Sequence, residues 1–240
     1  MSVSDFIGHG NRAALRPLPS PERDLALWWC ILARTDDGFP ALWATLSNDE
    51  VARAGRFGTD ALRHRYVVGR AALRQALARH LRVDPASVPI RRGPRGRPML
   101  EDAGSLDFNV THTRGIALIA ILDRPDWRVG VDIESVDRTL AHDGLARKFL
   151  TERERGAIAG LDDDARRRAF LRLWTCKEAM SKATGDGLSA TFDAIGIDTA
   201  REFVVAEGAG DYEPARWTLH PVTIADDLLA TVALWSVSAR

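Results

Sequence analysis

The acidic residues Asp132 and Glu134 stand two positions apart in the apolar segment Gly130-Val131-Asp132-Ile133-Glu134. Because side chains alternate along a strand, both carboxylates are expected on one face, with Val131 and Ile133 on the other. Neighbouring carboxylates repel each other unless a cation or a proton lies between them. Mg²⁺ commonly binds one or two carboxylates together with substrate phosphates. The spacing therefore suits a divalent metal, although a strand with a solvated polar face would show the same alternation.

A helix predicted over residues 165–184 carries a second group of candidate residues. Four of them are separated by three, four and four positions: Leu171, Trp174, Glu178 and Lys182. They therefore lie along one stripe of the helix. The glutamate and the lysine could form an ordinary surface pair of the i,i+4 type. However, the tryptophan indicates that the stripe is partly covered, and a covered glutamate needs a partner such as a metal.

Groups that can bind phosphate occur in the first half of the chain. The segment Asn109-Val110-Thr111-His112-Thr113 ends a predicted strand, and its hydroxyls and imidazole can bind phosphate oxygens. A histidine beside threonines is also common as an ordinary loop residue. Residues 50–97 contain twelve arginines and only three acidic residues, whereas the whole chain has no net charge. This distribution indicates a locally held anionic ligand, although a solvated helix face would be equally rich in arginine.

The composition is that of an ordinary soluble globular protein, with 45% hydrophobic and 28% charged residues. Cys30 and Cys176 form no metal-spaced pair, so we expect both to be small core residues in a reducing compartment. Residues 1–11 lack the apolar segment of a signal peptide, and no apolar run is long enough to span a bilayer. We therefore expect a cytoplasmic protein with no membrane partner. Walker, dinucleotide-binding, nucleophile-elbow and zinc-binding patterns do not occur.

Two similar runs of elements are expected to position these residues. The first run starts with a strand at 25–33 and a capping box at Ser47–Glu50, whose two side chains accept from each other's backbone N–H groups. A helix capped by Asp60 follows and reaches about Leu81. The segment 92–98 is then a basic loop that glycine and proline interrupt.

The second run repeats this order. A strand at 129–134 precedes a capping box at Thr151–Glu154, and Asp164 caps a helix that ends at Gly185. A shift of 104 residues superimposes the two runs without a gap and places Arg74 opposite Glu178. Further strands are expected at 108–110, 116–122, 191–198, 203–206, 216–222 and 228–237. We therefore expect an α+β fold of two similar lobes, residues 1–122 and 123–240, with residues 1–24 forming a strap or a disordered lead.

Taken together, the motifs resemble the signature of 4′-phosphopantetheinyl transferases of the larger, surfactin-synthetase-activating type. The signature joins Gly130-Val131-Asp132-Ile133-Glu134 to Trp174-x-x-Lys177-Glu178-Ala179-x-x-Lys182. Gly96-Arg97-Pro98 looks like the family's G-K/R-P loop, and Asn109–Thr113 looks like its N-x-S-H-S segment. The remaining matches are Arg53, Arg56-Phe57, Arg65 and Gly185-x-Gly187-Leu188. The resemblance extends over about residues 25–198.

The resemblance implies a monomer of two α+β lobes related by pseudo-twofold symmetry, with the active site at their interface. It implies transfer of the phosphopantetheine arm of coenzyme A to a serine of an apo acyl or peptidyl carrier protein. Adenosine 3′,5′-bisphosphate would be the second product. The carrier would serve fatty-acid, polyketide or nonribosomal-peptide synthesis.

The resemblance also implies roles for individual residues. Asp132, Glu134 and Glu178 would hold Mg²⁺ or Mn²⁺, and Glu178 is the candidate general base for the carrier serine. Lys182, with Lys177, would bind pyrophosphate oxygens, so Asp132, Glu178 and Lys182 are the candidate catalytic residues. The nucleotide end of coenzyme A, including its 3′-phosphate, would contact Arg53, Arg65, Arg97, Thr111 and His112.

The chain departs from the family pattern at few positions. Thr111 and Thr113 replace serines and keep the hydroxyls, whereas Asp186 places a negative charge where the family often has a lysine or a small residue. Two other functions remain as alternatives. Another magnesium-dependent phosphoryl-transfer enzyme or nucleotide hydrolase would not need the Thr-His-Thr segment and the arginine loop together. A nucleic-acid-binding protein could use the arginines, but no nucleic-acid motif is present, so no nucleic-acid partner is expected.

Overall fold

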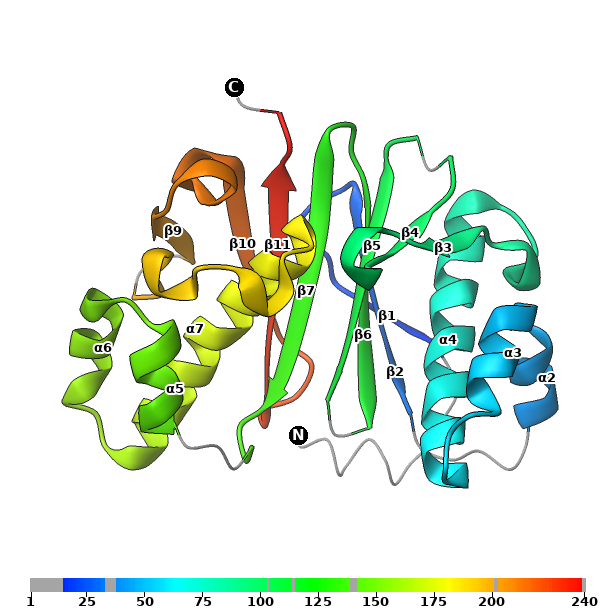
Figure 1. Ribbon diagram of the computed structural model, residues 1–240, viewed down its shortest axis with the longest axis horizontal. Coiled ribbons are helices and arrows are strands. Elements are labelled where there is room, and N and C mark those ends of the chain that lie inside the picture. Colours follow the sequence, from blue (N-terminus) through cyan, green and yellow to red (C-terminus); the bar gives the residue numbers. More distant parts are fainter. Residues whose placement is uncertain are drawn as a thin grey trace.

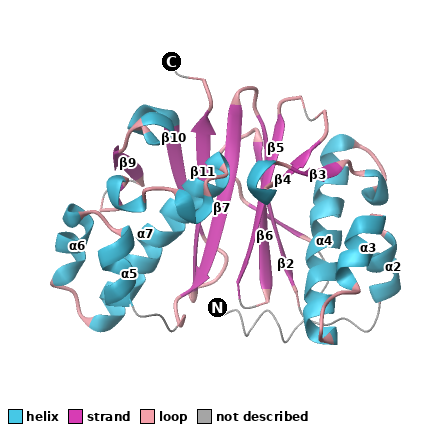
Figure 2. Cartoon of the chain, in the orientation of Figure 1, coloured by secondary structure: helices cyan, strands magenta, loops and turns pink. Residues whose placement is uncertain are grey.

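The computed structural model describes residues 15–32, 38–102, 104–113, 115–138, 142–200 and 203–238. In these parts the strands form a central block, which lies between the helices of residues 39–81 and those of residues 142–184 (Figure 1). Figure 2 shows the same division into two outer helical layers and inner strands. Residues 1–14, most of the predicted strap or lead, lie outside the described residues. Within the described part, no helix is both long and apolar enough to cross a membrane.

A four-stranded antiparallel sheet lies beside the first group of helices. Its strands, in spatial order, are β1 (Arg16–Leu18), β2 (Leu25–Ile31), β6 (Ile116–Asp123) and β5 (Leu106–Thr113). The helices are α2 (Phe39–Ala44), α3 (Asn48–Ala54) and α4 (Asp60–Leu81). Helix α4 buries Val68, Ala72 and Leu77 against Phe108 and Ile119 of the sheet. This contact is the apolar core of the first half.

A three-stranded antiparallel sheet lies beside the second group of helices. Its strands, in spatial order, are β10 (Trp217–Val222), β11 (Leu228–Ser236) and β7 (Trp127–Ser135). The helices are α5 (His142–Phe149), α6 (Glu152–Ala159) and α7 (Asp163–Thr184). Helix α7 buries Phe170, Cys176 and Met180 in a core that includes Ala233 and Trp235 of β11. Both helical layers therefore cover their own sheet.

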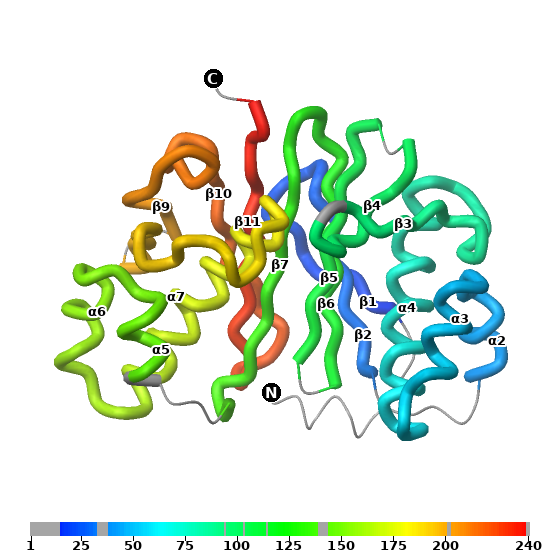
Figure 3. Tube along the Cα trace, in the orientation of Figure 1, coloured from blue at the N-terminus to red at the C-terminus, as the bar shows by residue number. Residues whose placement is uncertain are grey.

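The two sheets also pack against each other through their other faces. This inner core contains Leu27 and Leu118 from the first sheet and Val131, Ile133 and Val232 from the second. Because neighbouring strand residues point to opposite faces, the burial of Val131 and Ile133 here turns Asp132 and Glu134 toward α7, as the alternation predicted. Strands β5 and β7 contact each other along the junction of the two sheets (Figure 3).

Short elements complete the described structure. Two small antiparallel pairs are β3 (Ile90–Arg92) with β4 (Pro98–Leu100), and β8 (Gly196–Asp198) with β9 (Val204–Glu207). The 3₁₀ segments are η1 (Pro85–Ser87), η2 (Pro94–Gly96), η3 (Gly187–Ser189), η4 (Phe192–Ala194), η5 (Gly210–Tyr212) and η6 (Pro214–Arg216). The predicted basic loop is therefore the β3–β4 hairpin with η2 at its tip. The strand expected at 191–198 is confirmed only as β8, because η4 occupies residues 192–194.

Both long helices begin slightly earlier than predicted. The cap of α4 is Thr59, whose hydroxyl accepts from the Leu62 N–H at 3.3 Å, and not Asp60. The cap of α7 is Asp162, which accepts from the Ala165 N–H at 2.8 Å, and not Asp164. The acidic residues that follow each cap lie in the first turn, where negative charge stabilises the positive end of the helix dipole. The predicted end of α7 at Gly185, in the left-handed conformation with φ of 86°, is confirmed.

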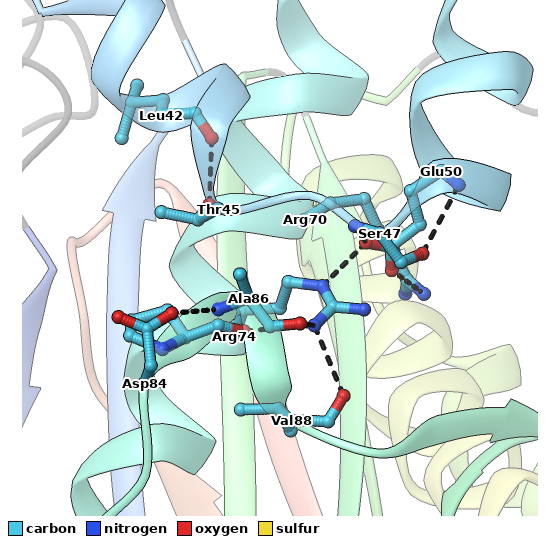
Figure 4. Close-up of polar contacts among 10 residues, drawn as sticks. Leu42, Thr45, Ser47, Glu50, Arg70, Arg74, Asp84, Ala86 and Val88 are labelled. Atoms are coloured by element: carbon cyan, nitrogen blue, oxygen red, sulfur yellow. Dashed lines mark hydrogen bonds and ion pairs between the residues drawn. The ribbon is translucent and has the colours of Figure 1, made fainter.

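Both predicted capping boxes are present, and each glutamate also binds a buried cation of the long helix. Glu50 accepts from the Arg74 Nε at 2.6 Å, and Glu154 accepts from the Lys177 Nζ at 2.6 Å (Figure 4 shows the first). The helix caps Thr59 and Asp162 are 103 positions apart, one fewer than the capping boxes. The structure therefore matches Arg74 with Lys177, and the predicted match of Arg74 with Glu178 is wrong by one residue.

Candidate active site

Three elements bring Asp132, Thr111 and Lys182 together. The Lys182 ammonium donates to Asp132 Oδ1 at 2.5 Å, to Thr111 Oγ1 at 3.0 Å and to the Val131 carbonyl at 3.3 Å. The Thr111 hydroxyl also donates to Asp132 Oδ1 at 3.1 Å. Thr111 lies on β5 of the first sheet, whereas Asp132 and Lys182 lie on β7 and α7. The predicted site residues from the two halves of the chain therefore meet at one point.

The second oxygen of Asp132 has a different environment. Oδ2 is buried and has no hydrogen-bond partner within the described part of the chain. A buried carboxylate oxygen without a partner costs free energy, about 1–3 kcal/mol for a neutral group and more for a charged one. An oxygen in this state is suited to accept a cation, a proton donor or a ligand group.

Glu134 and Glu178 lie close enough to Asp132 for the charges to influence one another. Burial raises the pKa of Glu134, and the negative charge of Asp132 raises it further, whereas the nearby Arg138 acts in the opposite direction. Arg138 forms an ion pair with the Glu134 carboxylate. Burial also raises the pKa of Glu178, followed by the charges of Asp132 and Glu134. The carboxylates of Glu134 and Glu178 are therefore more basic than isolated ones.

These carboxylates fit a divalent cation by their chemistry. The described residues contain no group of three His, Cys, Asp or Glu side chains that is already arranged around an ion position. Lys182 pairs with Asp132, and Arg138 pairs with Glu134. The partnerless Oδ2 of Asp132 and the mutual repulsion of three carboxylates are both relieved by a cation. Arg138 was not predicted, although its position four residues after Glu134 was a signal for it.

Gly130 explains how α7 comes so close to β7. A Cβ atom at this position would lie 1.9 Å from the Ala179 carbonyl oxygen and 2.6 Å from the Ala183 nitrogen. Only glycine allows the helix backbone to touch the strand at this point. The contact places the turn that carries Glu178 and Lys182 directly against Asp132. The close packing of α7 against β7 therefore explains why a glycine occupies position 130 of the predicted motif.

A hollow whose lining combines apolar side chains with several basic ones lies near the carboxylate site. It has a volume of about 470 Å³, and its lining includes Arg53, Arg65, Tyr66, Arg70 and His112. The Arg53 guanidinium lies 5.7 Å from the centre of the Tyr66 ring, in a cation–π contact. The structure thus brings Arg53 and Arg65 together with His112, as predicted. The charges of Lys182 and Asp132 act on His112, so the hollow lies near the carboxylate site.

The electrostatics of His112 reflect the surrounding cations. Partial desolvation lowers its pKa, and the positive charges of Lys182 and Arg65 lower it further, whereas Asp132 acts in the opposite direction. The neutral form of the imidazole is therefore favoured. A neutral ring can donate one N–H to a ligand oxygen and gains a second donor if the ligand's charge brings a proton.

Sequence reasoning missed Arg70, which lines two hollows. The second hollow, of about 530 Å³, also includes Arg53, Tyr66, Arg91 and Arg92 in its lining. Glu50 holds Arg70 in place through its Oε1, which lies 2.8 Å from the Arg70 Nε. The basic surface thus extends over α3, α4 and β3, with Arg53, Arg70, Arg91 and Arg92. The only sequence signal was the arginine-rich composition of this segment, which does not show which side chains face a ligand.

Lys177 does not reach the candidate site. Its side chain is 0% exposed, and its ammonium donates to Glu154 Oε2 and to the carbonyls of Phe149 at 2.9 Å and Phe192 at 2.8 Å. Burial lowers the pKa of Lys177, and the charge of Glu154 opposes this effect. The predicted contact of Lys177 with coenzyme A is corrected, because its ammonium is buried against Glu154. Successive residues of a helix point about 100° apart, so Lys177 does not follow Glu178 toward the site. A lysine one residue before a site glutamate cannot share its stripe.

Arg97 also has partners that were not predicted. Its terminal nitrogens donate to both oxygens of Asp107, at 3.0 and 2.7 Å, and its Nε donates to the Lys182 carbonyl at 2.9 Å. Further acceptors are the carbonyls of Phe108 and Val129. The side chain is 9% exposed. Arg97 therefore does not line the basic hollows, and the structure does not bring it together with Arg53 and Arg65.

Comparisons with known proteins place this geometry in context. Residues 128–233 match the family model of the 4′-phosphopantetheinyl transferase superfamily, and residues 33–122 match the model of the N-terminal part of 4′-phosphopantetheinyl transferases. The 4′-phosphopantetheinyl transferase HetI of Nostoc sp. is 35% identical over 214 residues, which are 88% of this chain and 87% of the relative. Sfp of Bacillus subtilis, also a 4′-phosphopantetheinyl transferase, is 25% identical over 56% of this chain and 58% of its own length.

A solved structure is similar over a smaller region. The holo-(acyl-carrier-protein) synthase of Bacillus anthracis, in complex with coenzyme A, has a TM-score of 0.38 and 21% identity. The match covers 46% of this chain and 96% of that chain. At this level of likeness nothing further follows for the present chain.

Proposed function

This chain belongs to the 4′-phosphopantetheinyl transferase superfamily, and from this premise we propose that the carboxylate site and the basic hollow act together on coenzyme A. The chain is a 4′-phosphopantetheinyl transferase, which transfers the phosphopantetheine arm of coenzyme A to carrier proteins. The observation that supports our placement of the reaction is the contact of Lys182 with Asp132 and Thr111, directly beside the hollow that contains His112.

Coenzyme A would lie across the junction of the two sheets. Its nucleotide end, with the 3′-phosphate, would occupy the hollow of Arg53, Arg65 and His112, to which the structure adds Arg70. Its pyrophosphate would then reach Thr111 and Lys182 at the boundary with the carboxylates. Several arginines in a partly enclosed hollow hold phosphate groups through charge-assisted hydrogen bonds.

The transfer step needs a base, an anion-stabilising group and an oriented nucleophile. The serine hydroxyl of an acyl or peptidyl carrier attacks the phosphorus that bears the pantetheine arm, and its proton passes to Glu178. The bond to the leaving phosphate of adenosine 3′,5′-bisphosphate breaks, and the Lys182 ammonium donates hydrogen bonds to oxygens that gain charge. As long as no cation binds it, the raised pKa of Glu178 makes it a stronger base than an exposed glutamate.

Asp132, Glu134 and Glu178 would hold Mg²⁺, with Mn²⁺ as a possible substitute. The bound cation would offset negative charge on the pyrophosphate. In the complex the Lys182 ammonium would turn from Asp132 Oδ1 to the phosphate. Its positive charge would thus offset the charge of Asp132 in the free protein and that of the substrate in the complex. Cation binding lowers the basicity of a ligating carboxylate, so Glu178 would serve as base only if it stays outside the ion's ligands or acts through water.

The architecture is proposed to follow the two-lobe plan that the sequence suggested. The turn between β6, which ends at Asp123, and β7, which begins at Trp127, supports a boundary between the lobes near residue 122. Each half contains a capping box, a long helix of 22 residues and a sheet under that helix. These matching parts support pseudo-twofold symmetry between the halves, and a site already formed by both halves supports a monomer.

Intact-mass measurement tests the proposed reaction. Incubation of the protein with coenzyme A, Mg²⁺ and an apo carrier should add about 340 Da to the carrier, the mass of the phosphopantetheine arm. A panel of apo acyl and peptidyl carriers would identify the preferred class. Release of nucleotide without any gain in carrier mass would indicate a hydrolase instead. Chelation of divalent cations should stop the transfer, and its survival would contradict the assigned metal site.

A further inference from the structure

The β3–β4 hairpin reaches the C-terminal end of α7 through Arg97. We propose that Arg97 and Asp107 form a positioning pair, which fixes the last turn of α7 and so holds the Lys182 side chain beside Asp132 and Thr111, from where its ammonium can turn to the phosphate. This inference rests on the proposed function. It makes Arg97 a residue that supports the rate of turnover and not one that binds coenzyme A. Arg97 would not touch the substrate.

Asp107 and Arg97 form a rigid, bidentate unit. Two parallel N–H to oxygen bonds, at 3.0 and 2.7 Å, fix the plane of the guanidinium. Asp107 Oδ2 also accepts from the Val129 N–H at 2.8 Å, and Arg97 donates to the Val129 carbonyl at 3.0 Å. The pair therefore joins β5 of the first sheet to β7 of the second. It lies directly before the Gly130–Asp132 segment, because Val129 is the preceding residue of β7.

The third nitrogen of Arg97, Nε, donates a hydrogen bond to α7. Lys182 lies in the last turn of this helix, whose carbonyl groups have no partner further along the helix. The Arg97 Nε donates to the Lys182 carbonyl at 2.9 Å. A cation at this end of a helix is also favourable to the helix dipole. Arg97 thus holds the backbone of the residue whose side chain reaches Asp132 and Thr111.

A second contact from the same hairpin has the same target. Arg95 forms an ion pair with Asp186, just after the end of α7. Asp186 also accepts from the Tyr212 hydroxyl at 2.8 Å. These bonds lower the pKa of Asp186, although burial acts to raise it. The acidic residue that departs from the family pattern is therefore balanced by an arginine of the hairpin, and both arginines secure the same end of α7.

The alternative role for Arg97, as a ligand of the 3′-phosphate, is disfavoured by its surroundings. The side chain is 9% exposed, and all three of its nitrogens already donate to protein oxygens. To bind a phosphate, Arg97 would have to leave Asp107, which would then be a partly buried carboxylate without its cation. Arg53 and Arg65 of the hollow form no ion pair with a carboxylate in the described part of the chain, so they are open to a ligand without such a change.

Steady-state kinetics of Arg97→Lys and Asp107→Asn test the proposal. Each variant should lower kcat by about tenfold to a hundredfold, the effect expected of a site displaced by about 1 Å. KM for coenzyme A and the ratio of KM values for coenzyme A and its 3′-dephospho analogue should change less than about threefold. Arg63→Lys is the matched control, because Arg63 pairs only with the neighbouring, exposed Asp60 in the described contacts.

Hydrogen exchange of the free protein gives a readout that does not require activity. Amides of residues 181–187 should exchange faster in both variants, whereas those of α4 should not change. Faster exchange in all elements would mean that the variant has lost global stability. This result would contradict the proposal that the pair fixes only the last turn of α7. The double variant should have a kcat no lower than that of the less active single variant, because the two residues act as one unit.

One pattern of results would overturn the proposal. Arg97→Lys would raise KM for coenzyme A but not for the dephospho analogue, Asp107→Asn would leave kcat unchanged, and exchange at residues 181–187 would stay as in the wild type. Arg97 would then be a phosphate ligand. If the wild-type protein transferred nothing to any carrier, the proposed function would fail instead, and the exchange experiment would still decide whether the pair holds α7.

Discussion

Arg74 of α4 and Lys177 of α7 occupy matching positions in the two halves of the molecule. Each is buried, and each donates to the glutamate of the capping box that precedes its helix. Each also donates to backbone carbonyls of the segments that pack beside the helix, Val88 for Arg74 and Phe192 for Lys177. The motif lysine that seemed to belong to the active site is thus the counterpart of a structural arginine.

Replacing Lys177 by methionine should therefore reduce stability. Glu154 would remain buried without its cation, which costs about 3–5 kcal/mol when one partner of a buried pair is removed. Urea unfolding measures the loss. The double variant Lys177→Met, Glu154→Gln should recover part of it, because no buried charge is left. A large rise in KM for coenzyme A with normal stability would show instead that Lys177 contacts the substrate.

Replacing Asp132 by asparagine should remove activity while the fold remains. The amide keeps the size of the side chain but loses the charge that Lys182 and a divalent cation need, so kcat should fall about a hundredfold or more. Circular dichroism checks the fold, and calorimetric titration with Mg²⁺ should show weakened binding. Asp163→Asn is the control, because this exposed carboxylate pairs with Arg166 near the start of α7. Undiminished turnover in Asp132→Asn would remove Asp132 from the mechanism.

Replacing Gly130 by alanine should separate α7 from β7. The added Cβ would lie 1.9 Å from the Ala179 carbonyl oxygen, a backbone atom that cannot move alone. We expect a loss of about 1–3 kcal/mol in the free energy of unfolding and a fall in kcat, because Glu178 and Lys182 move with the helix. Gly156→Ala is the control, since nothing lies within 4 Å of its added Cβ. Thermal unfolding and the transfer assay measure both effects.

Binding of coenzyme A should take up a proton through His112. Its pKa is lowered in the free protein by desolvation and by nearby cations, whereas a bound phosphate would favour the charged ring. The affinity should therefore fall as pH rises through the pKa of the complex, and proton uptake should be largest between the pKa of the free protein and the pKa of the complex. Calorimetry in buffers of different ionisation enthalpy measures the uptake. His112→Gln should abolish it, and an unchanged uptake would assign it to another group.

Much of the local structure could be predicted because it depends on residues that are near one another in the chain. The two capping boxes require only hydrogen bonds between positions three residues apart, and both were predicted correctly. The strand alternation that buries Val131 and Ile133 between the sheets also turns Asp132 and Glu134 toward α7. The helix caps were less predictable, because Thr59 and Asp162 compete with neighbouring acidic residues that are also good caps.

The amino-acid sequence by itself determined which groups could share a face: the carboxylates of β7, and Glu178 with Lys182 on α7. Strand and helix periods settle such relationships before any packing occurs. Only the tertiary structure decided which basic side chains face the site. Arg53 and Arg65 line the hollow, Lys177 turns inward to Glu154, and Arg97 pairs with Asp107. Long cationic side chains can reach several partners, so their roles depend on which acceptors the packing of helices and sheets brings within hydrogen-bond distance.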